Sequence, residues 1–266
     1  MRILFLGDIV GRIGRNAVKH ALPLLVKKYQ VDFVIANGEN ATHGKGLIEK
    51  HYNELIDAGV DVITLGNHYM SKNNILDYIS DAERLIRPLN VTTHIGGVGS
   101  KLFECNGVKI RVTNILGTAF MKEEVTMPYA ALKDLIEEYE DEDAIHIIDF
   151  HAEATGEKMC FGYLFDGEVS AIIGTHTHIQ TNDARILPNG TGYMSDAGMC
   201  GAKNGVLGFD RNTVINKTIF GSEQRFEINN DDEEMVNGVV LDIDENTKLC
   251  KDIITLRYFG DKNGKM

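Results

Sequence analysis

Five segments of the sequence place a polar side chain directly after a hydrophobic run, and these side chains are of the types that bind metal ions. Asp8 and Glu39 follow two such runs, and Gly66-Asn67-His68, His151 and Gly174-Thr175-His176-Thr177-His178 follow three more. Hydrophobic runs of this length are typical of strands, so we expect five strand ends to deliver oxygen and nitrogen atoms to one sheet edge. A pair of divalent metal ions requires that arrangement, and the pattern therefore favours a two-metal phosphoesterase.

A glycine precedes three of these polar groups and permits a tight turn at the strand end. The three segments are Gly7-Asp8, Gly38-Glu39-Asn40 and Gly66-Asn67-His68. Taken singly, such a sequence is typical of an ordinary turn. Since residues just beyond the carboxyl ends of parallel strands converge on one crevice, three of them in consecutive strands favour a binding site.

Histidines at the strand exits support this hypothesis. His176 and His178 lie two residues apart, so in an extended segment both rings would lie on the same face. A lone histidine after a strand is more often structural than a ligand, but four of them, with His68 and His151, favour ligation.

The other histidines are interpreted as structural or as loop residues. Three lie in predicted helices or in a strand: His20, His51 and His146. His43 and His94 fall in predicted loops. Since His43 is close in sequence to Asn40, its contact with a substrate is left open.

The first half of the chain alternates strand and helix patterns, which predicts parallel strands with crossover helices. The expected elements are strands over 3–7, 31–37 and 60–66 and helices over 15–29 and 48–58. Pro23 should kink or split the first helix, and Gly59 should end the second in a left-handed conformation. Ser71 is expected to cap a further short helix, and Pro128 to begin a fourth.

The second half shows strand patterns with little helix between them. These strands are expected over 144–150, 159–165, 169–173, 192–195, 238–243 and 253–259. Such a succession predicts a mostly antiparallel sheet that packs on the first sheet. Because no internal repeat or long linker separates the halves, residues 1–266 are predicted to form one α/β domain of two stacked sheets flanked by helices.

Composition limits the kinds of partner. With 43% hydrophobic and 25% charged residues, the chain is typical of a globular protein, and no apolar stretch reaches the roughly 18 residues that span a bilayer. Without a signal-peptide pattern, the protein is expected to be cytoplasmic and to act away from membranes. The four cysteines show no C-x-x-C spacing, so free and mostly buried thiols are expected.

The net charge of −12 opposes binding to a long nucleic acid, because the polyanion would be repelled over a Debye length of about 8 Å. A small phosphorylated substrate remains compatible, since two divalent ions would make the site itself positive. No coiled-coil heptads announce an assembly, and a homo-oligomer is left open.

The motifs resemble those of calcineurin-like metallophosphoesterases, and in finer detail those of the YmdB family of bacterial phosphodiesterases. The matching blocks include Gly7-Asp8-Ile9-Val10-Gly11, Asn37-Gly38-Glu39-Asn40-Ala41, Leu65-Gly66-Asn67-His68, Asp149-Phe150-His151-Ala152-Glu153 and Gly174-Thr175-His176-Thr177-His178-Ile179-Gln180-Thr181. The resemblance implies the metallophosphoesterase fold, a four-layer α/β/β/α sandwich of two stacked mixed sheets flanked by helices.

The resemblance also implies a ligand set. Asp8, Glu39, Asn40 and His178 would hold one metal ion, and Glu39, Asn67, His151 and His176 the other, with Glu39 as the bridge. A mixed nitrogen and oxygen set without thiolate suits iron, manganese or zinc. The family resemblance favours iron.

Four features differ from the wider superfamily or from the usual blocks. The usual Asp-x-His of the first strand is Asp8-Ile9-Val10, so one histidine ligand is missing, and Asn40 is positioned to replace it. Glu39 stands where the superfamily has a bridging aspartate. Tyr69 follows His68, and Cys200 lies in the expected loop Gly198-Met199-Cys200-Gly201. Either side chain could change the shape of the pocket, and a contact of Cys200 with the substrate is left open.

The expected chemistry follows from the charges. Two metal ions would lower the pKa of a shared water to give a hydroxide that attacks the phosphorus, and His68 would stabilise the transition state or act as the general acid. The resemblance implies 2′,3′-cyclic nucleotides as substrates. Two alternatives stay open: a metal-dependent phosphomonoesterase such as a nucleotidase, and a non-catalytic regulatory module that binds a phosphorylated ligand.

Overall fold

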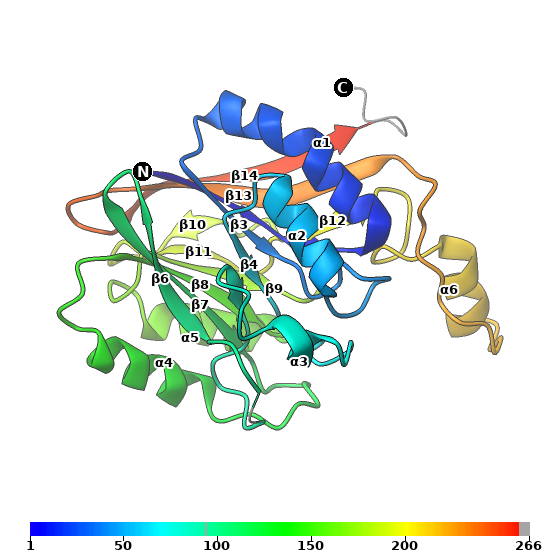
Figure 1. The fold of residues 1–266 in the computed structure, drawn as a ribbon, viewed down its shortest axis with the longest axis horizontal. Coiled ribbons are helices and arrows are strands. Elements are labelled where there is room, and N and C mark those ends of the chain that lie inside the picture. Colours follow the sequence, from blue (N-terminus) through cyan, green and yellow to red (C-terminus); the bar gives the residue numbers. More distant parts are fainter. Residues whose placement is uncertain (94, 261–266) are drawn as a thin grey trace.

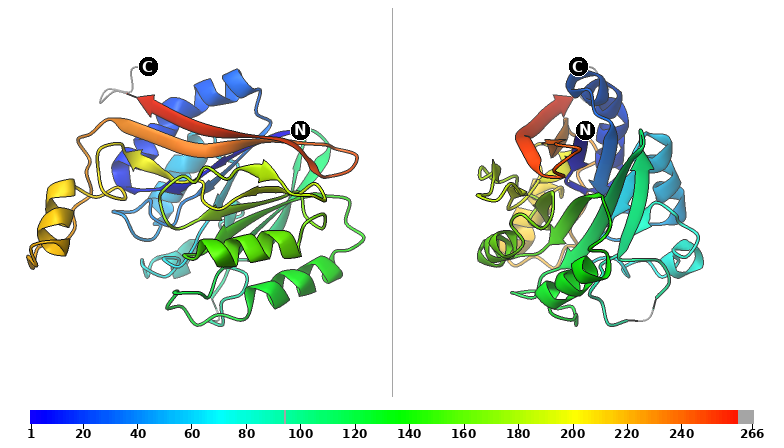
Figure 2. Two further views of the ribbon diagram at one scale, coloured as in Figure 1. Left: turned by 180° about the vertical axis from the view of Figure 1, so that it is seen from behind. Right: turned by 90° about the vertical axis from the view of Figure 1, so that its left-hand side faces the viewer.

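The computed structural model describes residues 1–93 and 95–260, so His94, which the sequence places in a loop, lies outside the described residues. Two stacked sheets lie between two layers of helices (Figures 1 and 2). The strands of the first sheet are β1 (Arg2–Leu6), β2 (Asp8–Ile9), β3 (Phe33–Asn37), β4 (Val62–Thr64), β5 (Leu85–Ile86), β12 (Met199–Ala202), β13 (Glu234–Ile243) and β14 (Cys250–Gly260). Those of the second sheet are β6 (Ser100–Cys105), β7 (Val108–Leu116), β8 (Ile145–His151), β9 (Ala171–Thr175), β10 (Arg185–Ile186) and β11 (Gly192–Met194).

Helices cover the outer face of each sheet, which confirms the four-layer α/β/β/α architecture. The helices are α1 (Gly11–Tyr29), α2 (Glu49–Asp57), α3 (Ile75–Tyr78), α4 (Pro128–Glu138), α5 (Thr155–Leu164) and α6 (Arg211–Thr218). Side chains of α1, α2 and α3 pack on the first sheet, and those of α4 and α5 pack on the second.

Both sheets are mixed. In the first, β1, β3, β4 and β5 run parallel, whereas β13 pairs antiparallel with β1, β12 and β14. In the second, β7, β8, β9 and β11 run parallel, and β6 and β10 are antiparallel edge strands. The prediction that the second half forms a separate, mostly antiparallel sheet is therefore wrong, because β13 and β14 complete the first sheet.

The central strands β1, β3, β8 and β9 are rich in hydrophobic residues because each buries both of its faces. In β1, Ile3 and Phe5 contribute to the core between the sheets, and Leu4 and Leu6 face the helices. In β8, Ile147 lies in the core between the sheets and Phe150 in the core beneath α4 and α5. The two sheets thus share one buried core. That residues 1–266 form a single domain stays a prediction.

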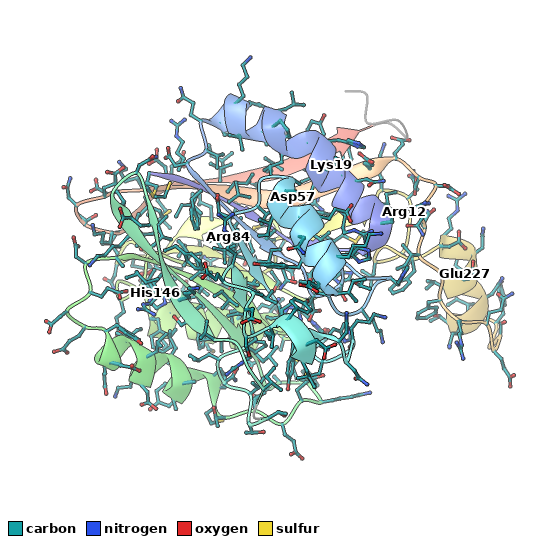
Figure 3. The ribbon with its side chains drawn as sticks, in the orientation of Figure 1. Arg12, Lys19, Asp57, Arg84, His146 and Glu227 are labelled. Carbon is teal, nitrogen blue, oxygen red and sulfur yellow. The ribbon has the colours of Figure 1, made fainter. Side chains whose placement is uncertain are left out.

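The helices of the first layer lie largely where the sequence predicts them. The helix α1 begins at Gly11 and runs through Pro23 without a break, so Pro23 does not split it. Gly59 follows α2 with φ of +104°, and the N–H groups of Gly59 and Val60 donate to the carbonyls of Ile56 and Leu55. This is a Schellman motif and confirms the predicted end of α2. The exposed side chains of Arg12, Lys19 and Asp57 mark the outer surface of this layer (Figure 3).

Two local predictions are wrong. Residues 159–165 lie mainly in α5 and are not a strand, because the parallel neighbours β8 and β9 need a crossover connection. Phe161 stacks on Phe150 with ring centroids 4.1 Å apart and so fixes α5 on the second sheet. Ser71 does not cap α3, whose N-cap is Asn74.

A segment that contains α6 extends away from the two sheets (Figure 1). Asp210 caps α6 by accepting hydrogen bonds from the N–H groups of Asn212 and Thr213, and α6 has no buried residue. We call residues 203–233 the arm. None of the described helices is long and apolar enough to cross a bilayer. All four cysteines are free, but only Cys200 and Cys250 are buried.

Candidate metal centre

The predicted ligands come from the strand ends of both sheets and meet between them. Asp8 lies in β2, and Glu39, Asn40, Asn67 and His68 follow β3 and β4 of the first sheet. His151 ends β8, and His176 and His178 follow β9 of the second sheet. The prediction of a single sheet edge is therefore wrong, although the polar groups do come together at the carboxyl ends of parallel strands.

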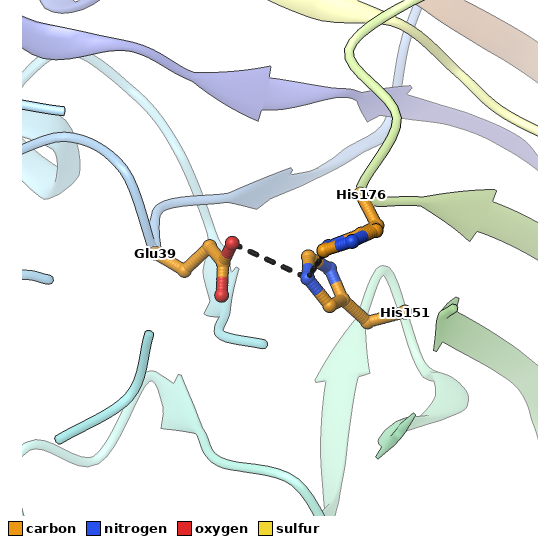
Figure 4. A group of neighbouring side chains, drawn as sticks. All are labelled: Glu39, His151 and His176. Carbon is orange, nitrogen blue, oxygen red and sulfur yellow. Dashed lines mark hydrogen bonds and ion pairs between the residues drawn. The ribbon is translucent and has the colours of Figure 1, made fainter. Parts of the chain in front are cut away.

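One group of side chains converges on the imidazole of His151 (Figure 4). The Nε2 atom of His151 lies 3.2 Å from Glu39 Oε1, 2.9 Å from Asn67 Oδ1 and 3.0 Å from His176 Nδ1. Potential ligand atoms of Glu39, His151 and His176 all lie within 4.8 Å of one another. Four atoms that can each donate an electron pair to a cation thus face one small volume.

A second group converges on the side-chain amide of Asn40. Its Nδ2 atom lies 3.0 Å from Glu39 Oε1, 3.1 Å from His178 Nε2 and 3.4 Å from Asp8 Oδ1. The oxygen and nitrogen of an asparagine amide are assigned from their surroundings, and rotating the amide would direct Oδ1 at the same three atoms. Since Glu39 Oε1 belongs to both groups, the two groups share one oxygen.

The donor atoms of these groups fit metal ions. All are carboxylate, amide or imidazole atoms, which suit iron, manganese or zinc. Asp8 and Glu39 are almost completely buried, and two buried carboxylates side by side need positive charge nearby. No thiol belongs to the set. Cys200 lies in β12, which pairs with β2, and not in a loop as the sequence predicts, and its side chain is buried in the core.

The electrostatics of the site depend on the contact between Glu39 and His151. Burial alone would raise the pKa of Glu39, but the charge of His151 lowers it overall. Burial alone would lower the pKa of His151, but the Glu39 carboxylate raises it overall. Burial raises the pKa of Asp8. Burial lowers the pKa of His176 to about 3, which keeps this imidazole in the neutral form that metals bind.

Hydrogen bonds behind the ligands orient two of the imidazole rings. Thr175 Oγ1 donates to Asp149 Oδ1 over 2.6 Å, so it accepts from His151 Nδ1 at 2.8 Å. His178 Nδ1 donates to the carbonyl of Leu207 over 3.0 Å. Both contacts engage Nδ1 as the donor, so Nε2 of each ring is the nitrogen that a neutral imidazole would offer to a cation. Burial raises the pKa of Asp149 to about 6 even though three side chains donate to its carboxylate.

A buried ion pair holds the loop that carries His176 and His178. Lys158 of α5 is fully buried and donates from Nζ to Asp196 Oδ2 over 2.9 Å and to the carbonyl of Thr175 over 2.8 Å. Asp196 also accepts from the N–H of Thr177 at 2.9 Å. The peptide groups on both sides of His176 are thereby fixed.

That fixation is needed because the loop is strained. His176 has φ of +106° and His178 has φ of +66°, which are unfavourable values for residues with a Cβ atom. The sequence motifs indicate no role for Lys158 or Asp196, because their pairing depends on where α5 lies on the second sheet.

We expect Lys158→Met to lower the free energy of unfolding by about 3–5 kcal/mol, because Asp196 is left as a buried charge without its partner. Urea denaturation of variant and wild type measures the difference. Lys133→Met removes an exposed pair with Glu137 and should change the same quantity by less than about 0.5 kcal/mol. A loss of similar size in both variants would show that the buried pair has no special importance.

Gly66 lies against the candidate ligands Glu39 and His151, where no side chain fits. A Cβ atom at Gly66 would lie 2.3 Å from Glu39 Oε2 and 2.5 Å from His151 Nε2. We expect Gly66→Ala to displace both side chains and to weaken metal binding about 10- to 100-fold, as changes beside metal ligands generally do. Titration with manganese, followed by calorimetry, measures the affinity. Gly156→Ala, where a Cβ atom would meet nothing within 4 Å, is the matched control, and unchanged affinity in Gly66→Ala would contradict the expectation.

An open pocket of about 310 Å³ lies over the two groups. Its lining residues are Glu39, Asn40, Gly44, Lys45, His68, Glu153, His176, Thr177, His178, Leu207 and Phe209. His68 donates its backbone N–H to Glu39 Oε2 over 2.8 Å, and burial lowers the pKa of its imidazole.

The structure also places the residues whose contact with substrate the sequence leaves open. In the segment around His43, Gly44 and Lys45 are the residues that line the pocket. Tyr69 is buried in the core beneath the first helical layer. Burial raises the pKa of Cys200 to about 12, so this thiol is neutral. None of these three side chains is among the described residues that line the pocket.

Comparison with known proteins gives a consistent result. The family model described as "YmdB-like protein" matches residues 4–256. A Bacillus subtilis protein named 2′,3′-cyclic-nucleotide 2′-phosphodiesterase is 46% identical over 248 residues, which are 93% of this chain and 93% of that protein.

Solved structures show the same fold. A Mycoplasma pneumoniae protein described as a novel phosphatase is 43% identical, with a TM-score of 0.91, over 98% of this chain and 94% of that one. The NAD nucleotidase of Haemophilus influenzae is 13% identical, with a TM-score of 0.57, over 98% of this chain and 56% of that one. The last similarity concerns the fold alone.

Proposed function

This chain belongs to the YmdB-like protein family, and from that premise we propose that it is a metal-dependent phosphodiesterase acting on small phosphodiesters, above all 2′,3′-cyclic nucleotides. One observation carries the proposal: two groups of buried and half-buried nitrogen and oxygen atoms share Glu39 Oε1, and Glu39 and His68 both line an open pocket. A site of this kind binds and polarises a phosphoryl group.

The proposed ligands form two sets. Asp8, Glu39, Asn40 and His178 would hold one ion, and Glu39, Asn67, His151 and His176 the other. Iron is the metal that we favour, with manganese and zinc as alternatives that suit the same donors. When bound, the two ions would supply the positive charge that activates a water molecule and neutralises the phosphoryl oxygens.

The protein's own residues have three tasks in this mechanism. Thr175 and the carbonyl of Leu207 keep the rings of His151 and His178 in the orientation for ligation. The Asn67 amide donates from Nδ2 to Glu123 and thereby directs Oδ1 toward His151. His68 lines the pocket, and its imidazole lies outside the two groups, with Nδ1 3.4 Å from Ser71 Oγ. We assign this imidazole the proton or hydrogen bond that the departing oxygen needs.

Metal analysis and a substrate panel test the proposal together. Freshly purified protein should contain close to two ions per chain and should hydrolyse 2′,3′-cAMP and bis-p-nitrophenyl phosphate faster than p-nitrophenyl phosphate. Faster hydrolysis of p-nitrophenyl phosphate would favour the alternative of a phosphomonoesterase, to which the name of the M. pneumoniae relative points. Metal content without turnover of any substrate would favour a binding module.

The partners follow from the same chemistry. We propose a small phosphorylated substrate in the cytoplasm, with the charge of −12 opposing long nucleic acids. The assembly is proposed to be either a single chain or a homo-oligomer, which light scattering distinguishes.

A further inference from the structure

We propose that the pocket contains a nucleobase subsite, formed by Phe209 and Leu207, which binds the base of the substrate by stacking. This inference rests on the proposed function and adds to it the part of the molecule that recognises the base. It assigns to the beginning of the arm a role in substrate selection.

The pocket is divided into a polar and an apolar part. The polar part includes the candidate ligands Glu39, Asn40, His176 and His178, together with His68 and the positively charged Lys45. The apolar part consists of two side chains, Leu207 and Phe209, which we call the wall. A phosphoryl group suits the polar part, whereas a flat apolar group suits the wall.

The structure holds Phe209 in place before any substrate binds. Its N–H donates to the carbonyl of Val206 over 3.0 Å, and its carbonyl accepts from the N–H of Val206 at 2.9 Å. Its ring centroid lies 5.5 Å from that of Phe226, and its backbone bridges to Ile228. A ring that is fixed in this way loses little conformational entropy when a base stacks on it.

Gly44 brings the opposite loop against the same wall. Its φ is +81°, and a Cβ atom there would lie 2.6 Å from Ile228 Cδ1 and 3.5 Å from Phe209 Cε1. The absence of a side chain at this position therefore lets the backbone close on Phe209 without filling the pocket.

Leu207 connects the wall to the metal centre. Its carbonyl orients His178, while its side chain is 41% exposed in the pocket wall. One short segment therefore fixes both the ligand at the phosphoryl end and the surface for the base. Because both belong to one short segment, we expect the phosphate and the base of the substrate to be joined by a short unit such as ribose.

The occupant is a base rather than another apolar group for two reasons. The pocket volume of about 310 Å³ is in the range of small-molecule sites and bounds the ligand. An aromatic wall beside a phosphoryl site binds the flat face of any base, and it binds a purine more strongly because more area is covered. We expect a preference for purine over pyrimidine and little discrimination between adenine and guanine.

The test compares two cyclic diesters with the same five-membered phosphate ring, of which only one has a base. These are 2′,3′-cAMP and glycerol 1,2-cyclic phosphate. For metal-loaded Phe209→Ala, we expect the ratio of kcat/KM for 2′,3′-cAMP to kcat/KM for the glycerol compound to fall at least about tenfold, mainly through KM. Phe209→Tyr should keep the ratio of the wild type within about threefold.

Phe220→Ala is the matched control, since Phe220 lies on the same arm, is 75% exposed and is not among the residues that line the pocket. It should leave the ratio unchanged. If Phe209→Ala lowered kcat/KM by the same factor for both substrates while its metal content stayed normal, the proposed subsite would be overturned. Wild-type protein that hydrolyses neither diester would instead overturn the proposed function, so the two failures are distinguishable.

Discussion

Replacing Glu39 with glutamine is expected to remove both metal ions and to lower kcat/KM for phosphodiesters at least about 1,000-fold. Glu39 Oε1 lies 3.2 Å from His151 Nε2 and 3.0 Å from Asn40 Nδ2, so it is the one oxygen that both ligand groups share. A neutral amide supplies less charge to two cations than a carboxylate does, and its NH₂ group cannot act as a ligand. Elemental analysis of purified protein and steady-state kinetics measure the two effects.

The control for this prediction is Glu137→Gln, which makes the same chemical change on the exposed face of α4. It should retain the metal content and activity of the wild type. If Glu39→Gln retained two ions per chain, Glu39 would not be the bridge, and the proposed assignment of ligands to two shared sites would have to be abandoned.

The location of the site is largely predictable from the sequence because local patterns set the position of each polar group. A hydrophobic run, a glycine and a polar residue mark the end of a buried strand, as in Gly38-Glu39-Asn40. Parallel strands then bring such ends together. The pattern does not tell which sheet each strand enters, since β1 and β8 both contain hydrophobic runs and both are covered on two faces.

The misassigned segment over 159–165 shows a limit of periodicity. Met159, Phe161, Tyr163 and Phe165 alternate as in a strand. In the structure, Phe161 of α5 and Phe165, which caps the end of α5, are both buried, with ring centroids 4.9 Å from each other. The requirement for a crossover between β8 and β9 overrides the local pattern, and that requirement appears only when the parallel pairing is known.

Another signal was available in the sequence. Asn106-Gly107 joins β6 to β7, and its φ values of +52° and +80° are those of a type I′ turn. The dipeptide is a strong indicator of a hairpin and would have predicted these two strands. Long-range contacts give no comparable signal: Lys158 and Asp196 are 38 residues apart and pair only because α5 packs beside the ligand loop.

Alanine substitutions at the neighbouring residues Asn67 and His68 are expected to differ in their effect on metal content. Asn67→Ala should lose metal along with activity, because Asn67 Oδ1 lies 2.9 Å from His151 Nε2 within a ligand group. His68→Ala should keep both ions and still lower turnover of 2′,3′-cAMP by about 100-fold or more, since its imidazole is left free for the departing oxygen.

The leaving group gives the sharper test of His68. The ribose alkoxide that departs from 2′,3′-cAMP needs a proton, whereas p-nitrophenolate departs as a stable anion. A group that serves the leaving oxygen should therefore matter far less for bis-p-nitrophenyl phosphate, and His68→Ala should lose about tenfold or less on that substrate. His68→Gln, which keeps a hydrogen-bond donor but cannot transfer a proton, separates the two possible roles. Recovery of most activity in His68→Gln would assign hydrogen bonding to His68. Equal losses of His68→Ala on both substrates would show that His68 does not act in the leaving-group step. Unchanged turnover in His68→Ala would show that His68 has no role in catalysis.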